Sequence, residues 1–330
     1  MMKIAFAGFR HAHIFTLYEA VKKNSELEFV GAYEEHLPSK QDAAAKGICF
    51  TYDSYDAILQ DSEVDIVAIG DYYGARGKLV IQALKAGKHV LVDKPLCTHL
   101  YEVQEISRLL SEGNLVVGIM LDLLDSPNFQ KALNVIREGI LGRVNNIVFE
   151  GQHPLLYGKR PEWYYNQEMH GGVINDIAIH GMDLVRLFTG SDLEEVIGAR
   201  CWNFYAKAVP DWKDSAQFML RLSDGTGVIG DVSYASPDTQ GYSHPAYWHF
   251  RVWGENGMLD FGINTSEVQV YLNGKDLPEK ISQEKSENSY LLSFLSAVKE
   301  PCLREEFNRR MLAATKQTLL IQEKADRDNL

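Results

Sequence analysis

The chain has few cysteines, and none of the four forms a CxxC pair with another. They are Cys49, Cys97, Cys201 and Cys302. This spacing argues against a disulfide framework and a cysteine zinc site, and it favours a reduced, intracellular protein. The sequence also lacks the run of about 18 apolar residues that a membrane-spanning helix needs. Its first residues run directly into a glycine turn instead of forming a signal peptide, so we expect a cytoplasmic location.

Positive charge is scarce as well. The chain has 33 lysines and arginines against 45 aspartates and glutamates, a net charge of −12. An acidic surface repels nucleic acids and anionic membranes, so we expect neither as a partner. The 330 residues, 45% hydrophobic and 24% charged, suffice for two globular domains and exclude collagen-like, coiled-coil and disordered chains.

The first 120 residues alternate short apolar runs with segments of helical period. Runs rich in Val and Ile, and apolar nearly throughout, are typical of strands buried on both faces. The alternation predicts a doubly wound parallel sheet of the Rossmann type, in an N-terminal α/β domain over residues 1–121. The predicted strands are 3–7, 28–32, 64–69, 89–92 and 115–120, and the predicted helices include 14–23, 55–61, 79–86 and 103–111.

From residue 122 onwards the pattern changes to consecutive strand-like runs with turn signals such as Asp224-Gly225 and Asn273-Gly274. Such runs predict a mostly antiparallel, open sheet in a C-terminal α+β domain over residues 122–330. The predicted strands are 143–151, 196–204, 216–222, 227–234, 249–253, 258–261 and 267–272, and the predicted helices are 129–138, 173–188, 290–298 and 305–325.

A glycine turn between the first predicted strand and helix is the first candidate site. Residues 8–13 read G-F-R-H-A-H and keep only Gly8 of the dinucleotide pattern G-x-G-x-x-G/A. The free N–H groups and positive dipole of a helix start bind phosphate. A plain strand–helix turn stays an alternative. Arg10, at the second glycine position, could contact a pyrophosphate or a 2′-phosphate.

Glu34 lies at the end of the second predicted strand. A carboxylate there can accept hydrogen bonds from the adenosine ribose of NAD and repel the 2′-phosphate of NADP. Glu34 therefore favours NAD, while Arg10 leaves NADP open. An ordinary solvated carboxylate is the alternative for Glu34.

A lysine follows the predicted strand 89–92, in the sequence Asp93-Lys94-Pro95. This places Lys94 at the carboxyl edge of the sheet, where open α/β sheets bind ligands. There it can donate to a substrate oxygen and stabilise negative charge on it, and Pro95 fixes the backbone after it. A surface lysine on a loop is the alternative.

A second group of candidate catalytic residues follows the glycine pair at residues 171–172. If the segment is helical, Asp176 and His180 lie four residues apart on one face, and Asp183 can join them. A histidine near a carboxylate is a candidate general base at neutral pH, and a buried, hydrogen-bonded histidine is the alternative. No third ligand has a suggestive spacing, so we expect no metal here.

Taken together, these motifs resemble the glucose–fructose oxidoreductase / inositol dehydrogenase family, Gfo/Idh/MocA. Residues 86–95 resemble the family signature A-G-K-H-V-x-x-E-K-P, with Asp93 in place of Glu. Residues 139–144 resemble its G-x-L-G-x-[IV] connection, and residues 171–183 resemble G-G-x-x-x-D-x-x-x-H-x-x-D. The resemblance covers nearly the whole chain in order. The chain departs from it at residues 71–76, D-Y-Y-G-A-R, where the family often reads T-P-N-x-x-H, and at residues 120–121.

The resemblance implies a nicotinamide enzyme acting on sugars, polyols or their derivatives. By position, Lys94 and His180 correspond to the family's catalytic lysine and histidine, and Asp176 to its substrate-binding aspartate. It also implies a homo-oligomer, a dimer or tetramer, formed through the open sheet. The cofactor-binding residues that we expect are Gly8, Phe9, Arg10, His11, Ala12, Glu34, Asp71, Tyr72, Asp93, Lys94 and Pro95.

Aromatic side chains near the second motif are candidates for the substrate pocket. Aromatic rings suit the apolar faces of sugars, and domain packing is the alternative for each of them. The candidates are Trp163, Tyr165, His153 and His170.

The expected reaction is the reversible oxidation of a secondary alcohol to a ketone on a sugar, cyclitol or related polyol. His180 takes the hydroxyl proton as hydride passes to the nicotinamide, Lys94 binds the same oxygen, and Asp176 orients the substrate. Two alternatives stay open. One is a non-catalytic NAD(P)-binding sensor, and the other is a reductase acting on an imine or a C=C bond.

Overall fold

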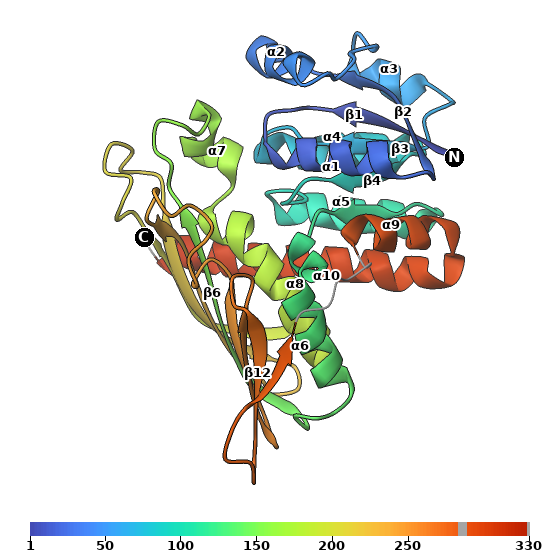
Figure 1. Ribbon diagram of the computed structural model, residues 1–330. Coiled ribbons are helices and arrows are strands. Elements are labelled where there is room, and N and C mark those ends of the chain that lie inside the picture. The colour runs from blue at the N-terminus through green and yellow to red at the C-terminus, as the bar shows by residue number, and fades with distance from the viewer. Residues whose placement is uncertain (283–288, 329–330) are drawn as a thin grey trace. The chain divides into compact units, whose positions relative to one another are not determined.

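The computed structural model describes residues 1–282 and 289–328 (Figure 1). They fall into two compact units. The first unit comprises Met1–Met120, Pro161–Gly171 and Tyr290–Thr315, and the second comprises the described residues of Leu121–Arg160, Gly172–Ser289 and Lys316–Leu330. The first unit therefore takes in two segments from later in the chain. The sequence places the end of the N-terminal domain at residue 121, and this domain boundary stays a prediction.

The first unit is built on a parallel sheet of five strands in the order β2-β1-β3-β4-β5. Every neighbouring pair is parallel, which confirms the predicted doubly wound sheet. The inner strands β3 and β4 are buried on both faces almost throughout, as their continuous apolar runs predict. The five strands are β1 (Met2–Ala7), β2 (Leu27–Tyr33), β3 (Ile66–Ile69), β4 (His89–Val92) and β5 (Val117–Ile119).

Helices pack with these strands, and α2 (Leu37–Ala45), α4 (Tyr73–Lys85) and the short helix α7 (Gln167–His170) differ from the sequence prediction. Helix α2 was not predicted, because it buries only Ala43 and so lacks an apolar stripe. Helix α4 begins six residues before the predicted start at residue 79. The others are α1 (His13–Lys23), α3 (Tyr55–Gln60), α5 (Leu100–Glu112), α9 (Tyr290–Lys299) and the first part of α10 (Pro301–Asp328), with a short 3₁₀ turn η2 (Glu162–Tyr165).

The core of the first unit joins residues from both ends of the chain. Phe6 of β1 and Ile14 of α1 belong to the same buried cluster as Leu291 and Phe294 of α9. Helix α9, from late in the chain, thus completes the core of the N-terminal sheet.

The second unit is built on a sheet of eight strands in the order β13-β12-β11-β10-β6-β9-β8-β7. All pairs are antiparallel except β6 and β9, which confirms a mostly antiparallel sheet. The short, polar edge strand β13 was not predicted. The strands are β6 (Val144–Pro154), β7 (Leu193–Trp202), β8 (Ser215–Leu222), β9 (Gly227–Ser236), β10 (His249–Gly254), β11 (Gly257–Gly262), β12 (Glu267–Leu272) and β13 (Glu279–Ser282).

Helices cover this sheet through a core of phenylalanines. Phe129 of α6 (Pro127–Arg137) and Phe188 of α8 (Ile179–Thr189) contact the rings of Phe250 and Phe261 on β10 and β11. A 3₁₀ turn, η1 (Asp122–Asp125), precedes α6, and a π-helical turn, η3 (Ile174–Ala178), precedes α8. Within the described parts of the chain, no helix has both the length and the apolar character needed to cross a membrane.

The packing of α9 gives a stability prediction. Phe294 is fully buried, so Phe294→Ala should lower the free energy of unfolding by about 3–5 kcal/mol through lost contacts and a cavity. Urea unfolding measures this. Leu292, on the same helix, is 42% exposed, and Leu292→Ala should cost less than about 1 kcal/mol. Equal effects of the two substitutions would contradict the placement of α9 on the core.

Candidate active site

The predicted cofactor residues gather at the carboxyl edge of the parallel sheet. Gly8, Glu34, Asp71 and Asp93 follow the ends of β1, β2, β3 and β4 by one or two residues. Strands β2 and β3 lie on opposite sides of β1, so the strand order reverses there. Ligands of open α/β sheets bind at this reversal point.

The turn after β1 requires its glycine. Gly8 has φ +82°, and a Cβ there would lie 2.6 Å from the backbone nitrogen of Asp71. The backbone N–H groups of Arg10 and His11 donate to the carbonyl of Gly70 at 3.1 and 3.2 Å. The turn is therefore fixed against the end of β3, and only glycine fits its first position.

Phe9 and Ala12 lie in the same turn with structural contacts of their own. Phe9 is buried, and its ring centroid lies 5.5 Å from that of Phe50 and 5.8 Å from that of Phe15. Ala12 is the residue immediately before α1. The start of α1, with the positive end of its dipole, thus lies at this edge of the sheet.

Glu34 holds the turn from the neighbouring strand. Its side chain is buried, and its two oxygens accept the backbone N–H groups of Phe9 at 2.6 Å and His36 at 2.7 Å. Each carboxylate oxygen can accept a second hydrogen bond. The predicted ribose contact of Glu34 is compatible with this geometry and stays a prediction.

Arg10 lies among acidic side chains. Its Nε is 3.2 Å from Asp71 Oδ1 and 3.8 Å from Glu34 Oε1, and its Nη2 is 3.5 Å from Glu35 Oε1. Its guanidinium lies 5.2 Å from the centroid of the Tyr72 ring. A cation is therefore fixed at the position where the dinucleotide pattern has its second glycine.

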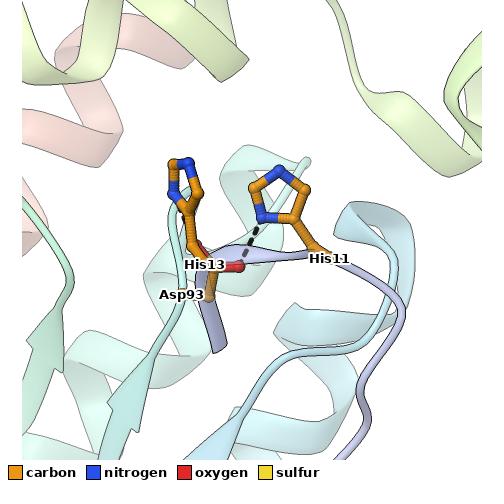
Figure 2. Close-up of side chains that lie close together, drawn as sticks. All are labelled: His11, His13 and Asp93. Atoms are coloured by element: carbon orange, nitrogen blue, oxygen red, sulfur yellow. Dashed lines mark hydrogen bonds and ion pairs between the residues drawn. The ribbon is translucent and has the colours of Figure 1, made fainter. Parts of the chain in front are cut away.

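Asp93 is the centre of a buried charge network. Its Oδ2 lies 3.2 Å from Nη2 of the fully buried Arg76, and 2.5 Å from Nδ1 of His11. His13 Nδ1 lies 3.5 Å from the other oxygen, Oδ1 (Figure 2). Burial opposes ionisation, but His11 and Arg76 hold the pKa of Asp93 well below its usual range. Asp93 is therefore a carboxylate at neutral pH.

His11 links this carboxylate to Tyr73. Burial lowers the pKa of His11 to about 3, although Asp93 opposes the shift. The neutral ring donates its Nδ1–H to Asp93, which leaves Nε2 to accept from the Tyr73 hydroxyl at 3.1 Å. The three side chains form a continuous hydrogen-bonded line.

Lys94 is buried beside this line. Its side-chain nitrogen lies 5.8 Å from the centroid of the Tyr73 ring. Its carbonyl accepts from Arg76, and the Lys94–Pro95 peptide bond is cis. Arg76 thus fixes the backbone from which the predicted catalytic lysine projects.

The predicted pocket aromatics divide between the two units. Trp163, Tyr165 and His170 belong to the first. Trp163 lies 5.0 Å and His170 5.3 Å, centroid to centroid, from Tyr73, and Tyr165 lies on η2 beside Tyr164. Their role in a substrate pocket stays a prediction.

In the second unit, Asp176 lies in η3 and is buried. The hydroxyl of Tyr234, on β9, donates to its Oδ2. The glycine at 172 is needed here, because it has φ +99° and a Cβ would meet the side chain of Gln322. Gln322 accepts the backbone N–H of Ile174 at 3.0 Å, which fixes the start of the turn.

His180 lies in the first turn of α8 and is buried. Its Nδ1 is 3.7 Å from Asp122 Oδ1, and its ring lies 5.5 Å from that of Trp248. The segment is helical as predicted. Its first part, however, is a π-helical turn, which changes the angle between Asp176 and His180 from that of a regular helix.

His153, at the end of β6, lies among aromatic rings. Its centroid is 5.0 Å from Tyr247, 5.7 Å from Trp248, 5.8 Å from Tyr242 and 6.4 Å from Tyr234. Trp248 contacts both His153 and His180. The predicted pocket residue and the predicted base are therefore neighbours of one indole ring.

Several residues of these networks were missed from the sequence, among them Arg76, Tyr234 and Asp122. Arg76 occupies the place where the family often has histidine, and its charge could have pointed to a buried partner. Tyr234 and Asp122 carry no local signal, because a strand tyrosine and a loop aspartate are common. Only the fold brings them to Asp176 and His180.

The first unit fits a nicotinamide dinucleotide. Gly8 lets the turn lie directly against the backbone of Asp71, a helix begins at the turn, and Arg10 supplies a fixed cation for phosphate. Arg10, His11 and Ala12 would hold the phosphates and Glu34 a ribose. Fold and turn together define a dinucleotide-binding protein.

Comparison with known proteins identifies the family. Residues 2–120 match the oxidoreductase family with an NAD-binding Rossmann fold, and residues 129–260 match the GFO/IDH/MocA C-terminal domain. A D-xylose dehydrogenase from Paenarthrobacter nicotinovorans is 29% identical over 79% of this chain and 69% of its own length. A myo-inositol 2-dehydrogenase from Thermotoga maritima is 24% identical over 78% and 72%. The chain belongs to the Gfo/Idh/MocA family and is an NAD(P)-binding oxidoreductase.

Solved structures agree on the fold. A 3-ketoreductase from Actinomadura kijaniata, in complex with NADP and TDP-benzene, superimposes with a TM-score of 0.79 at 16% identity. The match covers 98% of this chain and 97% of the reductase.

The turn gives a pH prediction. Burial raises the pKa of Asp71 to about 6, and Arg10 only partly offsets this. Between about pH 4 and pH 6 the folded chain keeps a proton that the unfolded chain releases. The free energy of unfolding contributed by Asp71 therefore falls as pH rises through this window, by about 3 kcal/mol in total.

Urea unfolding across this pH range tests the prediction. Asp71→Asn should remove this part of the pH dependence, whereas Asp53→Asn, at an exposed carboxylate, should leave the wild-type curve unchanged. Identical pH curves for wild type and Asp71→Asn would show that Asp71 titrates normally.

Proposed function

We propose that this oxidoreductase interconverts a secondary alcohol and a ketone on a sugar, cyclitol or related polyol. The observation that carries the proposal is the burial of Lys94, Asp176 and His180, which are 3%, 1% and 4% exposed. Ionisable side chains of these types are rarely buried to this degree in a folded protein. Such groups, at positions that match the family's catalytic motifs, favour a catalytic role.

Each of the three side chains has its own role in the proposal. His180 accepts the proton of the substrate hydroxyl, and Asp122, 3.7 Å from its Nδ1, stabilises the resulting charge. Lys94 donates to the substrate oxygen and stabilises its negative charge. Asp176, held by Tyr234, orients a substrate hydroxyl. The bound nicotinamide supplies the hydride chemistry.

A sugar or polyol fits the aromatic surroundings of these residues. The rings around His153 offer apolar faces with polar edges, which suit the C–H faces and hydroxyls of a sugar. The two dehydrogenases similar to this chain are named for xylose and myo-inositol. For the cofactor we propose NAD, because Glu34 lies at the position that would contact the ribose. A preference for NADP would instead indicate that Arg10 binds the 2′-phosphate.

Fluorescence titration with NADH and NADPH, followed by a sugar and polyol oxidation screen, tests the function. Wild type should bind NADH more tightly and oxidise at least one polyol. Lys94→Ala and His180→Ala should each lower kcat by about 10²–10⁴-fold, because each removes a proton-transfer or charge-stabilising group. Both variants should keep binding NADH.

The other outcomes point to the alternatives. Full turnover by either variant would refute the mechanism. Nucleotide binding without turnover on alcohols, imines or enones would favour a sensor, and turnover only on imines or enones would favour a reductase.

We also propose that the open sheet pairs with a second copy of this chain. Met219 on β8 and Ile229 on β9 are direct cross-strand neighbours, 47% and 45% exposed, and Ile197 on β7 is 52% exposed. Along β8 exposed and buried residues alternate, so these side chains share the solvent face. An apolar patch on a regular sheet face favours a protein partner.

Light scattering coupled to gel filtration tests the oligomer. Wild type should elute as a dimer or tetramer, and the double variant Met219→Asp with Ile229→Asp should dissociate because four or more carboxylates would face one another. Tyr271→Asp, at an exposed position of β12, should keep the wild-type mass. A monomeric wild type, or an unchanged mass in the double variant, would refute the interface.

A further inference from the structure

Two histidines and an aspartate meet at the turn after β1. His11 and His13 are two residues apart in the chain, and Asp93 follows β4 (Figure 2). One nitrogen or oxygen atom from each of the three lies within 4.8 Å of the others. A spacing of this size allows three side chains to bind one ion after small movements of their ends.

The aspartate presents one oxygen to this space. Oδ2 of Asp93 is engaged by His11 and Arg76. Oδ1 is buried and has no hydrogen-bond partner within the described residues, and it lies 3.5 Å from His13 Nδ1. A buried carboxylate oxygen without a hydrogen bond is costly, and an ion bound to it would remove that cost.

His11 is already oriented as metal-binding histidines are. Such residues usually bind the metal through one ring nitrogen and hydrogen-bond through the other. The Nε2 atom of His11 lies 3.1 Å from the Tyr73 hydroxyl, while Nδ1 faces Asp93. The outer hydrogen bond that would fix the ring is thus present.

Neighbouring cations are compensated by other groups. Arg76 donates to the carbonyls of Asp71, Asp93 and Lys94 in addition to Asp93 Oδ2. Arg10 lies against Asp71 and two glutamates. These contacts leave Asp93 Oδ1 without a hydrogen bond from either arginine.

We propose that His11, His13 and Asp93 form a binding site for one divalent transition-metal ion. Two imidazoles and a carboxylate suit Zn²⁺, Co²⁺, Ni²⁺ or Fe²⁺, whereas Mg²⁺ and Ca²⁺ prefer oxygen ligands. Three protein ligands leave at least one coordination position open to water or a small molecule. The site does not depend on the proposed reaction.

Binding requires one local change. The Nδ1–H of His11 donates to Asp93 in the metal-free structure, so this proton must move to Nε2, from which it can donate to the Tyr73 hydroxyl, before Nδ1 can bind the ion. Metal affinity should rise with pH, because imidazole binds a metal ion only in its unprotonated form.

Titration of the metal-stripped, untagged full chain with Co²⁺, without nucleotide, tests the site. Visible absorption reports the coordination, and equilibrium dialysis counts bound ions. Wild type should bind one Co²⁺ per chain with an absorption band that Zn²⁺ abolishes. His13→Gln should weaken binding by at least about tenfold, because even outer-shell changes have effects of that size. The side chain of His13 is 44% exposed, so this change should leave the fold intact.

His36→Gln is the matched control, because His36 is an exposed histidine of the same unit. It should bind Co²⁺ as wild type does. A wild type that binds no Co²⁺, or a His13→Gln variant that binds it as tightly, would overturn the proposal whether or not the chain oxidises polyols.

Discussion

The buried guanidinium of Arg76 is the interaction on which the carboxyl edge of the parallel sheet depends. It donates to the carbonyls of Asp71 at 2.8 Å and Asp93 at 2.6 Å, and it pairs with the Asp93 carboxylate. It thereby ties the end of β3 to the end of β4. A lysine could not replace it, because only the planar fork of arginine reaches several acceptors at once. Removing one partner of such a pair typically costs about 3–5 kcal/mol.

The same edge explains how a chain without two of the usual glycines keeps its turn. Glu34 accepts the N–H of Phe9, and the carbonyl of Gly70 accepts those of Arg10 and His11. Side chains and the neighbouring strand end therefore fix a loop that glycines usually shape. An arginine at the second glycine position is tolerated because acidic groups around it hold its charge.

More of the fold than of the candidate site could be predicted from the sequence. The periodicity of hydrophobic residues and the turn residues indicated both sheets, because buried strands and hairpins leave local patterns in the sequence. Helix α2 was missed because it buries only Ala43. The motifs indicated Lys94, Asp176 and His180, but the partners Arg76 and Tyr234 lie 17 and 58 residues from Asp93 and Asp176. Contacts over such separations arise from strand order, which no local pattern encodes.

The predicted catalytic residues of each unit are positioned by contacts within that unit. Arg76 fixes the backbone of Lys94, and Tyr234 fixes the carboxylate of Asp176. The π-helical turn matters here, because a regular helix would direct Asp176 differently from the geometry that β9 and Tyr234 impose. Preorganised groups of this kind need little rearrangement during reaction. Substitutions at Arg76 should therefore act through Lys94 and the cofactor turn, and substitutions at Tyr234 through substrate orientation.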